Sequence, residues 1–272
     1  MNDTGSPRRR WLVPAVIAAV VVIAGGAGLF YFFSGDEPDE VSLEAAVAAA
    51  TSTTATVAPE QATSTSGAPA ASETTTTTEA PTAAPDGIEG SWAVDTSIGT
   101  FDFESASGSF VGFRIGETLG QGIGETEAVG RTGAVSGSLE IIGSDVTSVS
   151  VEADLSVLTT DQSRRDSRAR DALNTGEFPT ASFVLTEAIE LPSGAAGGGA
   201  VSATATGELT VNGTTNPVTF DIEAQLVDGI IVVVASTEVT FADYGVSVPS
   251  AGIVLSVDDF GIVEMQLLFT RS

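Results

Sequence analysis

The amino-acid sequence predicts an all-β fold, an antiparallel barrel of about eight strands with one short helix, preceded by a transmembrane helix and a disordered stalk. Apolar and polar residues alternate along most of the chain after residue 90, which is typical of strands with one buried and one solvent-facing side. Helical periodicity is scarce there, which favours an antiparallel sandwich or barrel over βαβ units. Before residue 90 the composition changes twice, so we expect one folded domain at the C-terminal side.

The membrane helix is predicted at residues 11–33, an uncharged apolar run that follows Arg8, Arg9 and Arg10. As a helix it would span roughly 34 Å, enough for a ~30 Å hydrocarbon core. We expect a single-pass protein of the cell membrane, with residues 1–10 in the cytoplasm and the domain on the extracytoplasmic side. The alternative is a cleaved signal peptide, but this run is longer than a usual signal core and ends in LFYFF.

Residues 34–89 form the predicted stalk, whose Thr, Ala, Ser, Pro and Glu residues offer little surface to bury. Such a segment cannot offset the entropy lost on ordering, so we expect disorder. Within it, residues 41–50 (VSLEAAVAAA) have helical propensity but no strong stop signal and no evident partner. As a random coil, the stalk would separate the membrane from the domain by roughly 40 Å.

Residues 90–272 are the predicted domain and suffice for a barrel with its own core. Residues 148–157 (SVSVEADLSV) have apolar side chains at odd positions, and residues 218–226 (VTFDIEAQL) at even positions. Other runs alternate similarly or are rich in β-branched residues, as strands are. The strand-like runs are residues 91–94, 109–115, 133–142, 148–157, 180–188, 200–211, 218–226, 230–241 and 261–269.

Glycine marks the expected turns and loops of the domain. Asp228-Gly229 lies between two strand-like runs and predicts a tight hairpin. Asn212-Gly213-Thr214 matches a glycosylation acceptor, but its place between strands favours a turn. The glycine-rich stretches 116–133 and 193–199 are expected to be mobile loops.

Four arginines are concentrated within residues 164–170, in a region that is otherwise acidic. Asp161 or Ser163 can cap a short helix here, and Gly176 with Pro179 ends it. This helix lies between two strand-like runs, so we expect it to cross one end of the barrel.

The segments around this helix resemble the YceI-like domain family. They are residues 159–166 (TTDQSRRD) and 177–183 (EFPTASF), supported in the same order by SFVGFR at 109–114, VSGSL at 135–139, GELTVNGTTNPV at 207–218 and DYGV at 243–246. The resemblance covers residues 90–271. It implies a lipocalin-like barrel that binds a polyisoprenoid or other long-chain lipid outside the cytoplasm. Many relatives carry histidines that this chain lacks, so the barrel and its apolar interior are what the resemblance implies here.

The candidate site has two parts. Arg165 and Asp166 either pair with neighbours to fix the helix, or the arginines meet a lipid head group at the mouth of the barrel, since guanidinium groups bind phosphate well. The head-group candidates are Arg164, Arg165 and Arg168. The candidates for apolar contacts with lipid inside the barrel are Phe110, Phe113, Val135, Leu139, Val149, Val151, Leu155, Phe183, Leu185, Leu209, Phe220, Ile222 and Val239.

Several function classes are disfavoured by composition. The chain has no histidine, no cysteine and no G-x-S-x-G motif, so the usual nucleophile and base pairs are missing and we expect no enzymatic activity. Asp258-Asp259 lacks the ligand pattern of a calcium loop, and we expect no metal and no cofactor. The net charge of −26 argues against nucleic acid as a partner.

Two functions remain open on the sequence. The first is a membrane-tethered extracytoplasmic protein that sequesters or carries an isoprenoid or acyl chain in a hollow barrel. The second is a cell-surface interaction module with a filled barrel, whose loops bind a protein or a wall polymer. The volume left inside the barrel discriminates between them.

Overall fold

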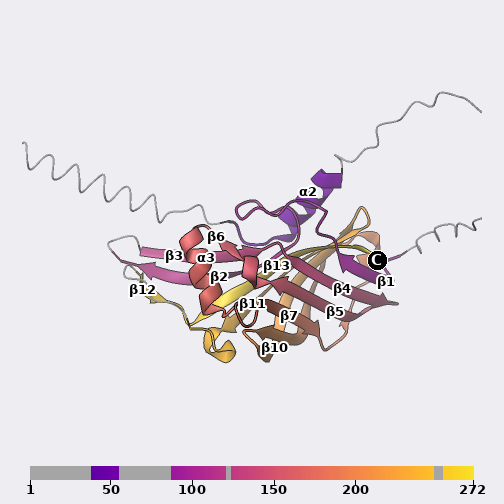
Figure 1. Ribbon diagram of the computed structural model, residues 1–272. Coiled ribbons are helices and arrows are strands. Elements are labelled where there is room, and N and C mark those ends of the chain that lie inside the picture. Colours follow the sequence, from indigo (N-terminus) through magenta and orange to yellow (C-terminus); the bar gives the residue numbers. More distant parts are fainter. Residues whose placement is uncertain (1–37, 55–86, 121–123, 248–253) are drawn as a thin grey trace, which may run out of the picture.

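A single antiparallel sheet, closed into a barrel, dominates the structure (Figure 1). The computed structural model describes residues 38–54, 87–120, 124–247 and 254–272. Eight strands form the closed ring, in the order β1, β4, β5, β7, β9, β10, β11, β13 and back to β1. Their bounds are β1 Gly90–Val94, β4 Val135–Ile142, β5 Asp145–Asp154, β7 Thr180–Leu185, β9 Val201–Val211, β10 Thr214–Val227, β11 Ile230–Thr240 and β13 Phe260–Arg271. The prediction of an eight-stranded antiparallel barrel is confirmed.

The remaining strands extend the sheet at one end of the barrel. The edge of β13 that pairs with β1 near the C-terminus pairs with β2 (Phe110–Leu119) farther back, and β2 then pairs with β3 (Gly124–Thr132). Short strands complete this region: β6 (Thr159–Thr160) pairs with β3, and β12 (Val254–Val257) pairs with β2. At β5, the two-residue strand β8 (Ile189–Glu190) adds one further pairing.

The β2–β3 hairpin corrects the expectation of a mobile loop at residues 116–133. Nine residues of β2 pair with β3, from Val111 opposite Thr132 to Leu119 opposite Gly124. The segment is poor in large apolar residues because much of it projects beyond the closed ring, so the strand pattern is weak. The backbone of β2 is nevertheless paired on both sides, with β3 on one and with β13 or β12 on the other.

Both predicted tight turns are present. Asn212 and Gly213 connect β9 to β10 with φ of 50° and 70°, and Asp228 and Gly229 connect β10 to β11 with φ of 51° and 81°. Two successive left-handed residues match the twist of a two-residue hairpin, for which Asn-Gly and Asp-Gly are the preferred sequences. The Asn212 amide donates to the carbonyl oxygen of Tyr244 (3.0 Å), as expected for a structural turn residue.

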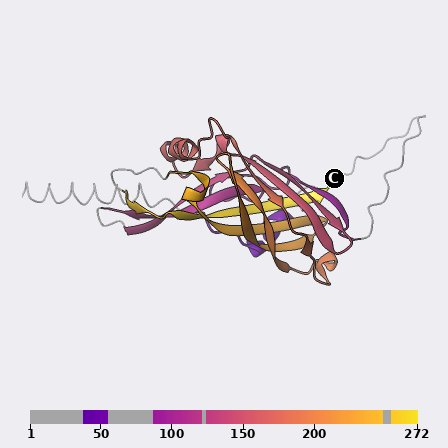
Figure 2. The ribbon, with the colours of Figure 1, turned by 90° about the horizontal axis from the view of Figure 1, so that it is seen from below.

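The predicted short helix is α3, Ser163–Ala172, at the β2–β3 end of the barrel (Figure 2). Its N-cap is Gln162, which makes no capping bond through its side chain, so the prediction of Asp161 or Ser163 was wrong. Asp161 instead pairs with Arg165 one turn later (2.7 Å). The Asp166 carboxylate accepts hydrogen bonds from the backbone N–H and the hydroxyl of Thr160, both 2.7 Å, which fixes the start of α3 to β6.

A second helix, α2 (Leu43–Thr54), lies on the outer surface of the barrel within the segment predicted as a stalk. Ala46 and Ala50 are fully buried (0% exposed) in a cluster with Ile230, Val232 and Leu268. The expectation of disorder is therefore wrong for residues 38–54, which we call the N-terminal strap. The partner of α2 is the outer face of β11 and β13. It could not be predicted, because alternation along these strands assigns that face to solvent.

The other predictions for the N-terminal part concern mainly residues 1–37 and 55–86, which lie outside the described residues. These include the predicted membrane helix at residues 11–33. Within the described part of the chain, no helix combines the length and apolar composition needed to cross a bilayer.

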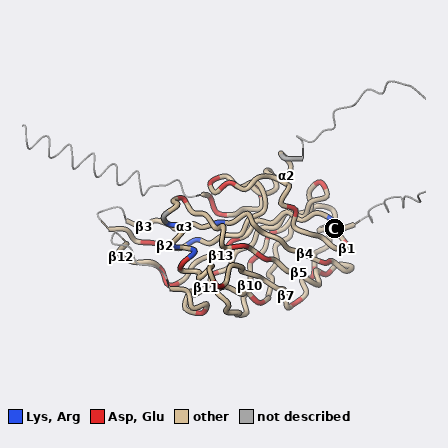
Figure 3. The backbone as a smooth tube through the Cα atoms, in the orientation of Figure 1, with Lys and Arg blue, Asp and Glu red and all other residues tan. Residues whose placement is uncertain are grey.

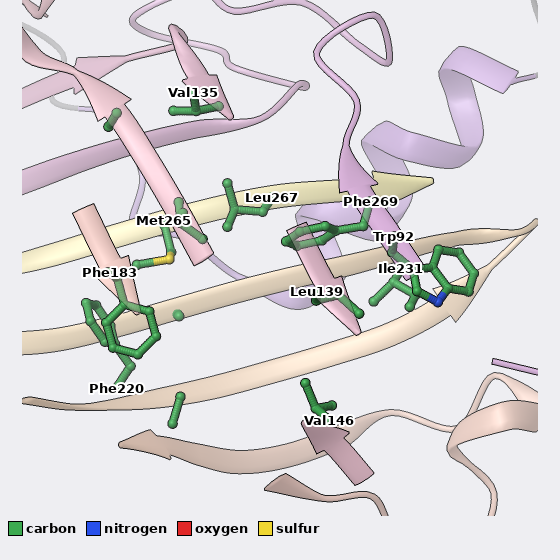
Figure 4. Packing of buried hydrophobic residues seen from close by; sticks show 14 of the residues in the cluster. Trp92, Val135, Leu139, Val146, Phe183, Phe220, Ile231, Met265, Leu267 and Phe269 are labelled. Carbon is green, nitrogen blue, oxygen red and sulfur yellow. The ribbon is translucent and has the colours of Figure 1, made fainter. Parts of the chain in front are cut away.

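The barrel core is apolar, and Trp92, Ile231 and Phe269 lie together at its β1 end (Figure 4). The Trp92 indole N–H donates to the Ile88 carbonyl oxygen (2.9 Å), and the Arg271 guanidinium lies 4.6 Å from its ring centre. Acidic residues are spread over the surface, whereas several of the few arginines gather near α3 and β2 (Figure 3).

Candidate functional site

A large cavity lies inside the barrel beneath α3 and has a volume of about 460 Å³. Its walls come from β2, β5, β7, β9, β11 and β13, and α3 forms one side. The space exists because many wall positions carry small residues. They are Ala128, Ala153, Ala169, Ala172 and Ala181.

The polar groups on the wall of this cavity are few, and most belong to α3 or the residues before it. They include Thr160, Gln162, Arg165 and Arg168. Arg168 is exposed and Arg165 is partly buried in its ion pair with Asp161. Glu117 of β2 also lines the cavity, which thus combines an apolar body with a polar rim of two arginines and one glutamate, a pattern that suits an apolar chain with a polar head.

Tyr244 adds a polar group that the sequence analysis did not select. It lies in the short 3-10 helix η4 (Phe241–Tyr244), lines the large cavity and is 4% exposed. Among the described residues, its hydroxyl has no hydrogen-bond partner within bonding geometry. Burial, aided by the Asp243 carboxylate, raises the pKa of Tyr244. The nearby Asn216 amide partly offsets this rise but donates its own hydrogen bond to the Asp243 carbonyl oxygen (2.8 Å).

A second, smaller cavity of about 120 Å³ lies in the barrel toward the β1 end. Its wall is almost wholly apolar and includes many alanines. Gln225 is the polar side chain there, and its amide is satisfied by the Gly198 carbonyl oxygen (2.9 Å). Three residues, Val151, Phe183 and Met265, line both cavities and therefore stand between them.

Comparison with known proteins agrees with this architecture. The sequence profile of the YceI-like domain matches residues 99–269, well over half of the 272-residue chain. The chain belongs to the YceI-like domain family. No curated protein matches the sequence.

Several solved structures are similar at low identity. A polyisoprenoid binding domain from Saccharophagus degradans, implicated in plant cell wall breakdown, has 16% identity and a TM-score of 0.48, covering 66% of this chain and 98% of that one. BcnA from Burkholderia cenocepacia has 14% identity and a TM-score of 0.46, covering 58% and 95%. The YceI protein of Campylobacter jejuni has 14% identity and a TM-score of 0.43, covering 53% and 85%.

The YceI-like barrel places most of the predicted interior residues on the two cavities. Those on the large cavity alone are Phe113, Leu155, Leu209 and Val239, and those on the small cavity alone are Leu139, Val149, Phe220 and Ile222. Val151 and Phe183 line both. Val135 and Leu185 belong to the core cluster but line neither cavity.

Phe110 is a correction, because the structure places it on the outer side of β2. Phe113 lines the cavity, and residues three apart on a strand point to opposite faces. The Phe110 ring instead lies against the Arg131 guanidinium, 4.5 Å from the ring centre to the central carbon. Of the arginine candidates, Arg165 and Arg168 line the large cavity, and the side chain of Arg164 is outside the described part.

An ion cluster is buried on the opposite, outer face of the same strands. Glu264 of β13 is 1% exposed and accepts from Arg114 (2.8 Å) and Arg131 (2.7 Å). The two guanidinium groups also donate to the strap, Arg114 to the carbonyl oxygens of Pro38 and Asp39 (both 2.6 Å) and Arg131 to that of Asp39 (2.7 Å). Burial alone would lower the pKa of Arg114, but Glu264 and Glu127 raise it, so the Arg114 guanidinium stays charged.

This outer cluster was missed because the sequence analysis considered arginines near α3 only. The sequence held no usable signal for it, because Arg131 lies in the stretch expected to be a loop and Glu264 lies at a strand position that alternation assigns to solvent. The cluster lines neither cavity, and its two arginines hold the strap against the barrel through their hydrogen bonds. In the described part of the chain, no group of three or more acidic residues could hold a metal ion.

Proposed function

We propose that this YceI-like protein binds the hydrocarbon chain of one isoprenoid or acyl lipid in the large cavity. The observation that carries the proposal is the cavity of about 460 Å³ inside the barrel, with an apolar wall and an arginine-bearing rim. Its volume lies within the ~300–1,000 Å³ typical of small-molecule sites. Each methylene group transferred from water would contribute roughly 0.8 kcal/mol, so an apolar chain binds without directional chemistry.

The rim supports an anionic or polar head group as the other end of the ligand. Arg168 is exposed at the rim, and the Arg165 guanidinium has donors left besides the one it gives to Asp161. The unpartnered Tyr244 hydroxyl can donate to an acceptor oxygen inside the cavity. No step of chemistry is required of these groups, and we expect binding without catalysis.

The filled-barrel hypothesis is disfavoured by the same observation. An interaction module of that kind needed bulky side chains to close the interior, whereas the wall of the cavity carries five alanines. The loops at the mouth can still contact other molecules, but a filled barrel does not account for the cavity beneath α3.

Native mass spectrometry of the full-length protein purified from a lipid-containing host tests the proposal. We expect a bound species with the mass of a single lipid. Ala172→Phe, which places a ring from α3 into the large cavity, should remove it, and Ala188→Phe, at an exposed position away from both cavities, should not. A wild-type protein free of lipid, or equal occupancy in both variants, would contradict the proposal.

We further propose that residues 11–33 anchor the protein in the cell membrane, with the domain outside the cytoplasm. The strap supports a short connection in place of a long stalk, because residues 38–54 are bound to the barrel. Residues 34–37 would then join anchor and domain, and four residues reach at most about 15 Å. The domain would stay at the membrane that supplies its lipid.

Two matched insertions test this tether. A flexible Gly/Ser segment of 20 or so residues is inserted after Gly35 in one variant and after Gly67 in the other, and each is placed in vesicles containing an acceptor dye. A fluorophore on Ser256→Cys, at exposed β12, reports the distance to the bilayer, since the chain has no other cysteine. We expect the first insertion to reduce energy transfer and the second to leave it unchanged. Equal effects would mean that the strap does not hold the tether.

A further inference from the structure

The two cavities are arranged as chambers separated by side chains, and the boundary between them is the feature of interest. Val151, Phe183 and Met265 line both, and we call these three residues the septum. The outer chamber of about 460 Å³ carries the polar groups of the rim, and the inner chamber of about 120 Å³ is almost wholly apolar. Figure 4 shows Phe183 and Met265 side by side, with Phe220 beyond the Phe183 ring.

Phe183 is the largest member of the septum, and its ring is held in place from two sides. On one side it meets the edge of the Phe220 ring, with 5.1 Å between centroids and 78° between planes. On the other it covers Gly207 of β9, where an added Cβ would lie 2.5 Å from two ring atoms. The absence of a side chain at Gly207 therefore gives the ring its position across the barrel.

The inner chamber has no evident use of its own while the septum is in place. Its walls include Ala203, Ala205, Ala224 and Ala235, and its one polar side chain, Gln225, is already hydrogen-bonded. An apolar space of this kind offers water no partners, so it gains nothing from hydration. Its wall is, however, apolar like that of the outer chamber, so it would accept more of the same hydrocarbon.

We propose that Phe183 sets the length of the hydrocarbon chain that this protein accepts, by ending the outer chamber at the septum. This inference rests on the proposed lipid-binding function. A chain that fills the outer chamber stops at the ring, and a longer chain leaves its excess methylene groups in water at the rim. Replacing the ring with a small side chain joins the chambers and lets a longer chain enter.

The test uses full-length protein in detergent and an equimolar mixture of n-alkyl phosphates of increasing length, read by native mass spectrometry. Occupancy of each length is divided by that of the wild type, which cancels partitioning of the probes into micelles. We expect Phe183→Ala to enrich the longest probes by tenfold or more, since each newly buried methylene is worth about fourfold in affinity. Phe183→Leu should shift the limit in the same direction by a smaller amount.

The matched control is Ile231→Ala, which enlarges the inner chamber and leaves the septum intact. Ile231 and Phe183 are similarly buried, at 8% and 5% exposure, so both variants lose core packing. The control should keep the wild-type length profile. An unchanged profile in both Phe183 variants, or the same shift in Ile231→Ala, overturns the inference. Failure of the wild type to bind any probe would instead count against lipid binding itself.

Discussion

The two faces of β13 are both buried, but they are covered in different ways. Val263, Met265, Leu267 and Phe269 face the barrel interior, where the packing leaves two cavities. Glu264, Gln266 and Leu268 face outward and are covered by other parts of the chain. The Glu264 carboxylate pairs with two arginines, and the Gln266 amide donates to the Gly108 carbonyl oxygen. The inner face thus leaves unfilled volume, whereas the outer face is fixed by ion pairs and hydrogen bonds.

The largest effect should come from breaking the outer face at its charge. Glu264→Ala leaves two buried guanidinium groups without their carboxylate, and removing one partner of a buried pair costs about 3–5 kcal/mol. Glu127→Ala removes a carboxylate that also pairs with Arg114 but is 35% exposed, so it should cost less than ~1 kcal/mol. Urea unfolding gives the free energy of unfolding of both variants. A loss below ~1 kcal/mol in Glu264→Ala as well would show that the outer cluster does not support the fold.

A smaller effect should follow from lifting the strap. Ala46→Glu puts a bulky charged side chain at a fully buried position against β11 and should lower the free energy of unfolding by about 1–3 kcal/mol. Ala45→Glu, one residue earlier and exposed, should stay within ~0.5 kcal/mol of the wild type. Hydrogen exchange should show that the α2 amides lose protection only in the first variant. Intact protection in Ala46→Glu would argue against the packing of α2 described above.

On the inner face, one substitution should act in the opposite direction. Tyr244→Phe removes a buried hydroxyl that lacks a partner, so the ligand-free protein should gain up to about 1 kcal/mol of stability. If the hydroxyl serves a bound lipid, the same variant should release lipid more readily in native mass spectrometry. A loss of stability in the ligand-free protein would mean that the hydroxyl is bonded in solution.

The smallest effect concerns pH. Hydrogen bonds from the hydroxyl and N–H of Ser97 lower the pKa of Asp95 below its ordinary 3.8. A lowered folded-state pKa stabilises the fold above the unfolded value, and this contribution is lost as the pH falls from 3.8 toward the folded pKa. Asp95→Asn should therefore lower the stability slightly at neutral pH, and the difference from the wild type should disappear as the pH falls below the folded pKa. Thermal unfolding measured across that pH range provides the check.

The sequence predicted the barrel well because most of its strands have one buried face. Residues 148–157 and 218–226 alternate, and both lie in or extend slightly beyond β5 and β10. Prediction failed where a second layer covers the sheet or where strands leave it. Alternation assigns the outer face to solvent, so neither α2 nor the Glu264 cluster could be inferred, and the glycine-rich β2–β3 hairpin has too few apolar residues to show a strand pattern.

The site was predicted in part for a similar reason. Parity along each strand identified residues such as Phe113, Val151 and Phe183, but it could not tell a filled interior from a hollow one. The cavities depend on which small residues face each other across the barrel, and that pairing is set by strand register. Phe183 and Tyr244 gain their particular roles from neighbours far away in sequence, Gly207 and Asn212.

Because the strap packs on the barrel, the folded part of the chain begins well before the family domain. The family match begins at residue 99, yet Pro38 and Asp39 accept hydrogen bonds from two core arginines. A recombinant fragment starting at Gly90 would leave Val232 and Leu268 bare, an apolar patch that invites self-association. Soluble preparations for crystallisation or lipid analysis should therefore start ahead of Pro38, and limited proteolysis of such a fragment should spare the chain from that residue to the end of α2.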